Sequence, residues 1–379
     1  MQRRAEYVRA LKPPGAGLYR ARRRRGLVVD LPLLALLAIA CAAGLLVLLS
    51  ASGHEWGYVR RQAVFMALGF AAMLAVAQVE VRTLRRFAPL VYVAGLVLLA
   101  LVPWFGVEAK GARRWLDLGP LRFQPAELLK IANPLVVAAF LAARPLPPRW
   151  WEVLAAAGLL AVPAVLVGLQ PDLGTAILIF AAGFFALFLA GLEKRYLAAA
   201  GLLALAAAPL FWFYLLHDYQ RTRILTLLDP QRDKLGAGWN IIQSTTAIGS
   251  GGWFGKGWQR GTQSQLDFLP ESHTDFIVAV LAEEFGLVGV LALIALYLLL
   301  VLRGLAIALG ARSTFARLLA GSLALTFFVY VFVNLGMVAG ILPVVGVPLP
   351  FFSYGGTALL TLFVGFGILM AVAGERKES

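Results

Sequence analysis

The sequence is poor in the residues that build covalent cross-links and metal centres. It has one cysteine in 379 residues, and Cys41 stands within an apolar run. A single cysteine excludes a disulfide framework, a zinc–cysteine site and an iron–sulfur cluster, and among apolar neighbours it usually behaves as a small hydrophobic residue. The three histidines, His54, His217 and His273, are too far apart for metal-ligand spacing. A histidine-built metal site is therefore not expected.

Charged residues are also scarce. Asp, Glu, Lys and Arg make up 14% of the chain and apolar residues 60%, with a mean hydropathy of +0.81, whereas soluble domains carry roughly 25% charged residues. One water-facing globule could not cover so much apolar surface. The composition therefore predicts a protein that is embedded in a membrane.

Ten stretches are long and apolar enough to span a bilayer, for which a helix needs about 20 residues, with a range of roughly 17–25. Pro171 separates the fifth stretch from the sixth. The predicted fold is all-α and polytopic, with about ten transmembrane helices and a large extracytoplasmic loop, 217–274, before the eighth. The ten stretches are 27–50, 62–79, 87–105, 127–143, 151–169, 173–192, 196–216, 275–302, 316–339 and 356–373.

Lysine and arginine indicate the orientation. With both termini in the cytoplasm, 21 of the 34 Lys and Arg residues lie inside, nine of them within 1–26, as the positive-inside rule requires. We therefore predict a basic cytoplasmic leader at 1–26, a single transmembrane domain at 27–373 and a cytoplasmic tail at 374–379. No small-residue cleavage site follows the first stretch, which indicates a retained anchor. Topology and anionic lipid headgroups explain the net charge of +14, so nucleic-acid binding is not expected.

The basic residues predicted to lie outside are clustered. Simple solvation explains them, since long translocated loops escape the charge rule. An outward-facing site for an anionic ligand such as a diphosphate explains them equally well. The candidates are Arg114 and Lys130 in and after the second outer loop, and Arg223 and Lys256 in the long loop.

The long loop also contains a glycine-rich stretch, 236–258, with three tryptophans. Glycine lets backbone amides approach a ligand closely, which favours a binding role. Tryptophan suits a membrane–water interface, which favours an interfacial amphipathic element with flexible turns. The sequence leaves both interpretations open.

Asp275 stands at the predicted start of the eighth helix. Ser272 or Thr274 can cap that helix, and a carboxylate in its first turn is favoured by the helix dipole, so capping is one interpretation. The other is a general base held at the membrane surface. Glu283 follows eight residues later, about 80° around the helix and ~12 Å deeper, where it could line the same cavity. Intramembrane carboxylates are functional candidates by default.

Further polar groups stand near the predicted span ends. Glu127 and Lys130 are three residues apart and can pair on one helix face, as a structural salt bridge or as part of a site. Asp172 is interpreted as the cap of the sixth span. The segment 343–356 is rich in Pro and Gly, and such irregular backbone at membrane depth must line a cavity or be buried in protein.

Five motifs together resemble the SEDS family (shape, elongation, division and sporulation). They occur in the family's order over most of 27–373, and Gly261–Gln265 is closer to the RodA branch, which serves elongation, than to the FtsW branch. The motifs are Gln124–Glu127, Gln170–Thr175, Gly261–Asp275, Ala282–Gly289 and Pro348–Gly356.

The resemblance implies an inverting glycosyltransferase that polymerises lipid II into peptidoglycan strands in the bacterial cytoplasmic membrane. It points to Asp275 as the indispensable carboxylate, the expected general base, with undecaprenyl diphosphate as the leaving group. The outer basic residues or a divalent cation, Mg²⁺ or Mn²⁺, would stabilise that group. The implied partners are a class B penicillin-binding transpeptidase and other membrane proteins of the elongation machinery. Glu127, Lys130, Asp172, Glu283 and Ser353 match family motif positions and, with Arg114, Arg223 and Lys256, are the predicted substrate-binding residues.

Two other functional classes stay open. Ten helices with intramembrane carboxylates also suit a lipid II flippase, and the chain could be a non-catalytic scaffold of the elongation machinery. Purified protein supplied with lipid II and no energy source separates the three.

Overall fold

A computed structural model describes residues 27–109, 112–117, 119, 122–216, 218–233, 236–262 and 272–377. Within these ranges a helix occupies each of the ten predicted spans, which confirms a multi-pass membrane protein. In the same ranges eight helical segments are long and apolar enough to cross a bilayer, with α8 counted together with its continuation to Tyr214. The helices α5 and α7 have 17 residues each. The ten are α2 (Leu31–Ala51), α3 (Trp56–Ala77), α4 (Val81–Phe105), α5 (Pro125–Leu141), α6 (Trp150–Leu169), α7 (Leu173–Leu189), α8 (Lys194–Leu210), α12 (Ile277–Leu309), α13 (Thr314–Val338) and α14 (Thr357–Lys377).

Several helix ends differ from the predicted ones. The helices α3 and α4 begin at Trp56 and Val81, before the predicted 62 and 87, because backbone hydrogen bonding continues into polar sequence beyond the apolar stretch. For the same reason α14 continues to Lys377, into the predicted tail. The predicted leader 1–26, and residues 263–271 of the Gly261–Asp275 motif, lie outside the described residues.

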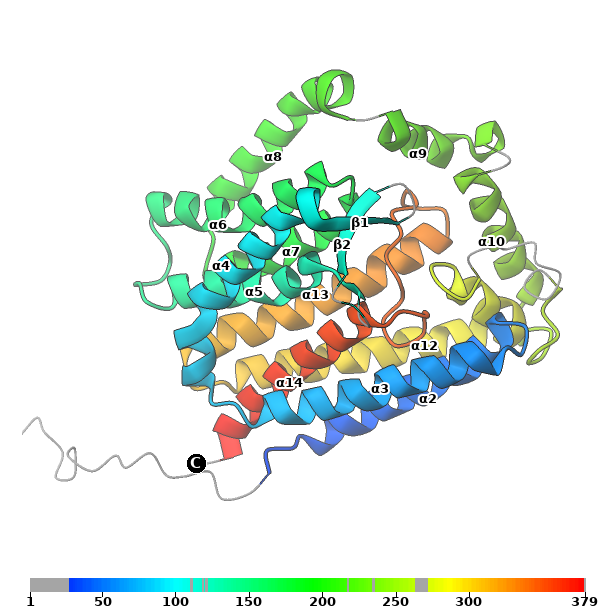
Figure 1. The fold of residues 1–379 in the computed structure, drawn as a ribbon, viewed down its shortest axis with the longest axis horizontal. Helices are drawn as coiled ribbons and strands as arrows, with labels where there is room; N and C mark the ends of the chain where they lie inside the picture. Colours follow the sequence, from blue (N-terminus) through cyan, green and yellow to red (C-terminus); the bar gives the residue numbers. More distant parts are fainter. Residues whose placement is uncertain are drawn as a thin grey trace, which may run out of the picture.

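The short helix α5 lies at the centre of the bundle. It contacts α4, α6, α7, α13 and α14, and most of its residues are buried. The pairs α3–α14 and α12–α13 pack beside it, and α2 runs along α12 (Figure 1). Because α5 faces protein, it can carry the buried polar residues Glu127, Lys130 and Asn133.

The helix α8 stands apart from the bundle. None of its residues is buried, and it projects away from the other helices before continuing into a π-helix, Phe211–Leu215 (Figure 1). Its exposed leucines suit lipid as a solvent.

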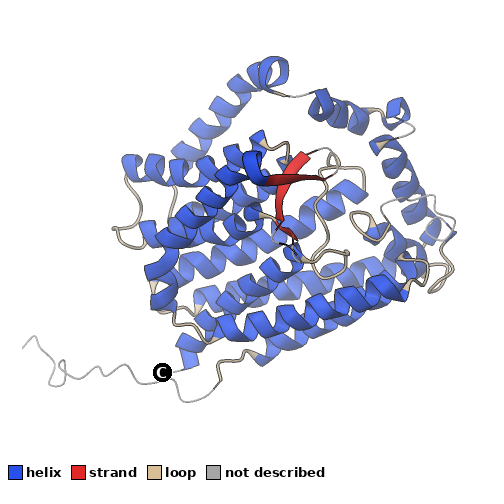
Figure 2. Ribbon diagram, in the orientation of Figure 1, coloured by secondary structure: helices blue, strands red, loops and turns tan. Residues whose placement is uncertain are grey.

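A small antiparallel sheet follows α4, which the all-α prediction missed. Its strands are β1 (Gly106–Ala109), β2 (Ala112–Asp117) and β3 (Arg122–Phe123), in the order β1-β2-β3 (Figure 2). Gly106 pairs with Leu116, which in turn pairs with Phe123. These strands are too short to give a clear period-two pattern in the sequence.

The described part of the long loop 217–274 is largely helical. It contains α9 (Asp218–Leu228), a 3₁₀ turn (Pro230–Asp233) and α10 (Ala237–Gly251). The helix α10 packs on α12, and the Ser244 hydroxyl donates to the Val338 carbonyl of α13 at 2.9 Å. The glycine-rich stretch is therefore packed against protein over much of its length.

The helix α12 is interrupted near its N-terminal end. Gly286 has φ +63° and ψ −162°, a conformation that L side chains rarely adopt. The segment 252–257 docks at the interruption and pairs with the backbone groups that the helix cannot satisfy, as membrane-embedded backbone requires. The four hydrogen bonds run from Leu287 N–H to Gly252 O (2.9 Å), Val288 N–H to Trp253 O (3.1 Å), Lys256 N–H to Glu283 O (2.9 Å) and Gly257 N–H to Glu284 O (3.0 Å).

Candidate active site

Asp275 lies in the turn 272–276, directly before α12, with a half-buried side chain. The helix begins after Phe276, whose side chain makes no capping hydrogen bond. The hydroxyl of Ser272, one of the predicted caps, donates to the Ala51 carbonyl at 3.2 Å.

The segment 345–347 passes beside the Asp275 carboxylate. Gly346 has φ +72°, and a Cβ at this glycine would lie 3.5 Å from Asp275 Oδ2. A residue with a side chain would be strained here and would extend towards the carboxylate. The irregular 343–356 backbone is therefore part of the wall around Asp275, as the sequence predicted for a cavity-lining or buried segment.

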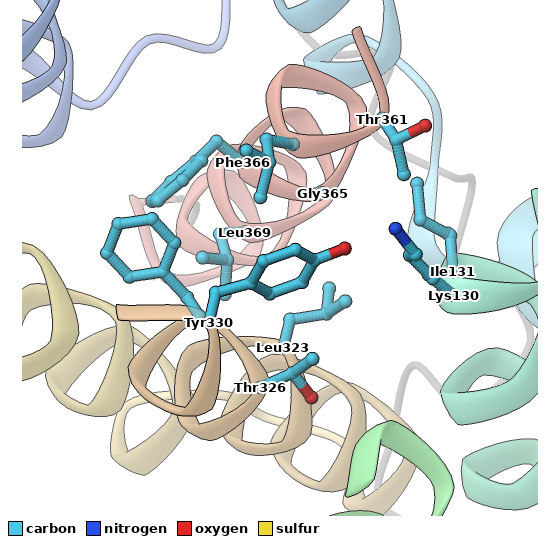
Figure 3. A pocket seen from close by; sticks show the side chains of 11 residues that line it. Lys130, Ile131, Leu323, Thr326, Tyr330, Thr361, Gly365, Phe366 and Leu369 are labelled. Atoms are coloured by element: carbon cyan, nitrogen blue, oxygen red, sulfur yellow. The ribbon is translucent and has the colours of Figure 1, made fainter. Parts of the chain in front are cut away.

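Glu127 and Lys130 form an ion pair inside the bundle. The Lys130 Nζ lies 2.7 Å from Glu127 Oε1, and both side chains are buried. The ammonium is 5.2 Å from the centroid of the Tyr330 ring. Figure 3 shows Lys130 and the Tyr330 hydroxyl facing each other. Both line a pocket of ≈ 40 Å³, together with mostly apolar residues of α13 and α14. The predicted pairing is confirmed.

Asp172 has the predicted capping role and two further partners. Its Oδ1 accepts from Thr175 N–H at 3.2 Å at the start of α7. Its Oδ2 accepts from Gln124 Nε2 at 3.0 Å and lies 3.8 Å from Arg114 Nη1. Arg114, on β2, also donates to the Gln170 carbonyl at 3.2 Å and to the Pro171 carbonyl. The sheet thereby fixes the turn between α6 and α7.

The segment 345–347 contacts three other parts of the bundle: the first turn of α7, the turn before α12, and α13. The contacts are Val345 O with Gly174 in the first turn of α7 (2.8 Å to a Cβ built there), Gly346 with Asp275, and Val347 with Tyr330 in one buried cluster.

Glu283 and Lys256 pair with each other. Glu283 Oε1 accepts from Lys256 Nζ at 2.6 Å, from Thr262 N–H at 2.8 Å and from the Thr262 hydroxyl at 3.0 Å. Glu283 is fully buried. These contacts anchor the end of the segment 251–262 to α12, whereas the sequence had suggested that Glu283 lines the Asp275 cavity.

The last two candidates have different surroundings. Arg223, on α9, lies with its guanidinium 5.7 Å from the Tyr219 ring centroid; α9 packs against the 3₁₀ turn and α10, away from the helices that carry Asp172 and Lys130. Ser353 is buried, and its hydroxyl accepts from Leu349 N–H at 2.8 Å and donates to the Thr274 carbonyl. Ser353 therefore supports the turn that carries Asp275.

Several buried polar residues of the spans were not predicted from the sequence, and Gln62, Tyr330 and Asn334 are three of them. Gln62 Nε2 donates to the Ser353 carbonyl at 3.0 Å, and Asn334 Nδ2 donates to the Asp275 carbonyl at 2.9 Å. A polar side chain within an apolar stretch is the signal that could have identified them.

Among the described residues, no three His, Cys, Asp or Glu side chains converge as a metal-ligand set. The fixed partners of Asp172 and Glu127 are nitrogen donors of Gln124, Thr175 and Lys130. A cation bound at Asp275 would therefore draw most of its ligands from the substrate or from water.

The comparisons with known proteins agree with this architecture. The family model of FtsW, RodA and SpoVE, described as a cell cycle protein, matches residues 28–378. Peptidoglycan glycosyltransferase MrdB of Escherichia coli (strain K12) is 54% identical over 345 residues, which cover 91% of this chain and 93% of the relative. Probable peptidoglycan glycosyltransferase FtsW of Geobacter sulfurreducens (strain DL-1 / KN400) is 38% identical over 361 residues, 92% of this chain and 96% of that protein.

Solved structures show the same fold. A peptidoglycan synthase complex, described as coordinating polymerization and crosslinking, contains a chain that matches with a TM-score of 0.82 at 36% identity, over 93% of this chain and 100% of the other. The Thermus thermophilus rod shape determining protein RodA matches with a TM-score of 0.70 at 34% identity, over 92% and 98% of the two chains.

Proposed function

The chain belongs to the SEDS family of FtsW, RodA and SpoVE proteins, and on this premise we propose that it is a peptidoglycan glycosyltransferase that polymerises lipid II during cell elongation. The observation that carries the proposal is the Asp275 carboxylate beside Gly346, on a segment that also contacts the first turn of α7 and packs with Tyr330 of α13. One relative is named peptidoglycan glycosyltransferase MrdB and the other probable peptidoglycan glycosyltransferase FtsW, and the chain is 54% identical to the first and 38% to the second.

The proposed chemistry needs a base and a stabilised leaving group. The 4-hydroxyl of the acceptor sugar attacks the anomeric carbon of the lipid-linked donor, the hydroxyl proton passes to the Asp275 carboxylate, and the bond to undecaprenyl diphosphate breaks. Attack opposite the leaving group converts an α-linked donor into a β-linked product. Asp275 supports this role because its half-buried carboxylate lies beside Gly346, in the turn directly before α12.

The leaving diphosphate requires positive charge nearby. Lys130 is a buried cation beside a small, mostly apolar pocket, and Arg114 holds the turn 170–172 through two backbone carbonyls. Lys256 is paired with Glu283, and Arg223 lies on α9, so these two support the proposal less directly. A divalent cation, Mg²⁺ or Mn²⁺, would supply further charge; a titration of activity with each ion after chelation tests for it.

We further infer that both termini are cytoplasmic and that 217–274 faces outward in the bacterial inner membrane. The 21 basic residues on the proposed inner side support this orientation. Cysteine labelling in a Cys41→Ala background should label a cysteine placed at exposed Thr246 only from outside. Labelling only from the cytoplasm contradicts the orientation.

The proposed partner is a class B penicillin-binding transpeptidase. Its support is the likeness to a chain of a solved peptidoglycan synthase complex. Co-purification of the two proteins from membranes tests the assignment.

The decisive experiment uses the purified full chain in liposomes with lipid II and no energy source. Glycan strands are expected, with and without the transpeptidase. Movement of lipid II between leaflets without strand formation favours a flippase instead. A protein that does neither, yet binds the elongation partners, is a scaffold.

A further inference from the structure

Three consecutive carbonyl groups in front of α12 are each bound by a different donor. The last of the three belongs to Asp275, so the backbone that carries the proposed base is fixed from outside its own helix. The donors are Tyr354 N–H to His273 O (2.9 Å), the Ser353 hydroxyl to Thr274 O, and Asn334 Nδ2 to Asp275 O (2.9 Å).

Asn334 makes a second bond from the same nitrogen. Its Nδ2 donates to the Val347 carbonyl at 2.7 Å, and the residue is fully buried on α13. One amide thus ties the Asp275 backbone to the segment 345–347, whose Gly346 lies against the Asp275 carboxylate. The amide orientation is determined, because the opposite orientation would place Oδ1 against two carbonyl oxygens.

We propose that Asn334 is a positioning residue for the glycosyl transfer: it sets the place of Asp275 relative to the segment 345–347. The inference rests on the proposed function, in which Asp275 accepts the proton. The Asn334 side chain acts through the Asp275 backbone and does not itself carry the proton. A misplacement of about 1 Å at a reacting group can lower a rate by roughly 10²-fold.

A general role in helix packing would make a different prediction. Ser322 provides the comparison, because it is also buried on α13 and its hydroxyl donates to the Ala182 carbonyl of α7. It lies twelve residues before Asn334, or ~18 Å along the helix. Both substitutions remove one buried polar side chain, but only one of them touches the Asp275 turn.

The experiment compares Asn334→Ala with Ser322→Ala in liposomes, normalised to folded protein. For Asn334→Ala we expect kcat to fall about 10- to 100-fold, with KM for lipid II little changed, because a transition-state contact is disturbed. For Ser322→Ala we expect the wild-type kcat. Asn334→Ser, which can donate to only one of the two carbonyls, should be intermediate and serves if the alanine variant does not fold.

A double-mutant cycle with Asp275→Asn completes the test. If Asn334 acts through Asp275, its substitution should lower the residual rate of Asp275→Asn by only about threefold or less, so the two losses are not additive. Additive losses overturn the positioning role. A wild-type kcat in the Asn334 variants, when Asp275→Asn is inactive, overturns it too. Both results leave the proposed function intact. A near-wild-type rate in Asp275→Asn overturns the proposed function itself.

Discussion

Lys130 Nζ lies 2.7 Å from Glu127 Oε1 at the centre of the bundle, where both side chains are buried. The second carboxylate oxygen, Glu127 Oε2, has no hydrogen-bond partner among the described residues. Lys130 therefore supplies the neutralising charge for a carboxylate that has little other support. Breaking a buried pair by removing one partner leaves an uncompensated charge, which costs about 3–5 kcal/mol.

This pair gives the first prediction. Lys130→Met should destabilise the protein by about 3 kcal/mol or more, because Glu127 is left charged in an apolar interior. The double variant Glu127→Gln/Lys130→Met should recover most of that loss, since no buried charge remains. Denaturant unfolding in detergent micelles measures both free energies. A double variant no more stable than Lys130→Met would show that the charge pairing is not the main contribution.

The second prediction concerns Asp275. Asp275→Asn keeps the size of the side chain but cannot accept the proton, so strand formation should fall by about 10²–10⁴-fold. Insertion and binding of the transpeptidase should be unchanged, because Asn matches Asp in size and caps a helix as well as Asp does. Measurement of both strand formation and partner binding on the same preparation checks this. Polymerisation near the wild-type rate contradicts the general-base assignment.

The third prediction concerns the anchor of the segment 251–262. Glu283→Ala removes the shared acceptor of Lys256 and Thr262. The loss of these charge-assisted bonds should expose the segment, and trypsin should cleave after Lys256 or Arg260 roughly tenfold faster.

Arg223→Ala is the matched control for this experiment, because Arg223 is another loop residue whose ring contact is with its neighbour Tyr219. We expect its cleavage after Lys256 and Arg260 to equal that of the wild type. Equal cleavage in Glu283→Ala and the wild type means that other contacts hold the segment.

The fourth prediction concerns the interruption of α12. A Cβ at Gly286, which has φ +63°, would lie 2.4 Å from Gly255 N. Gly286→Ala should therefore cost at least about 1–3 kcal/mol from backbone strain alone, and the yield of folded protein should fall. Gly249→Ala, in α10, is the control, because nothing lies within 4 Å of its Cβ position. Size-exclusion profiles and melting temperatures of both variants measure the difference. Equal melting temperatures for Gly286→Ala and Gly249→Ala would contradict the predicted backbone strain at position 286.

The sequence could predict the helices and the kinds of residue in the site, because both depend on hydrophobicity and on local spacing. Lipid demands long apolar helices, so all ten spans were visible as hydrophobic stretches. Glu127 and Lys130 pair within one turn of α5, and Asp172 caps α7, so both arrangements are set by local spacing. The strands β1 to β3 were missed because they are short and carry no clear alternation.

The tertiary structure decided how these groups meet. Nothing in local spacing relates Asp275 to Gly346 or Asn334, which are 71 and 59 residues away. The pairing of Lys256 with Glu283 depends on the docking of the segment 252–257 at the interruption of α12. The sequence by itself thus determined the membrane fold and the kinds of chemical group available, because these follow from hydrophobicity and from neighbours along one helix. Only the packing of α12, α13 and the segment 345–347 decided which of those groups surround Asp275, because those contacts join residues far apart in the chain.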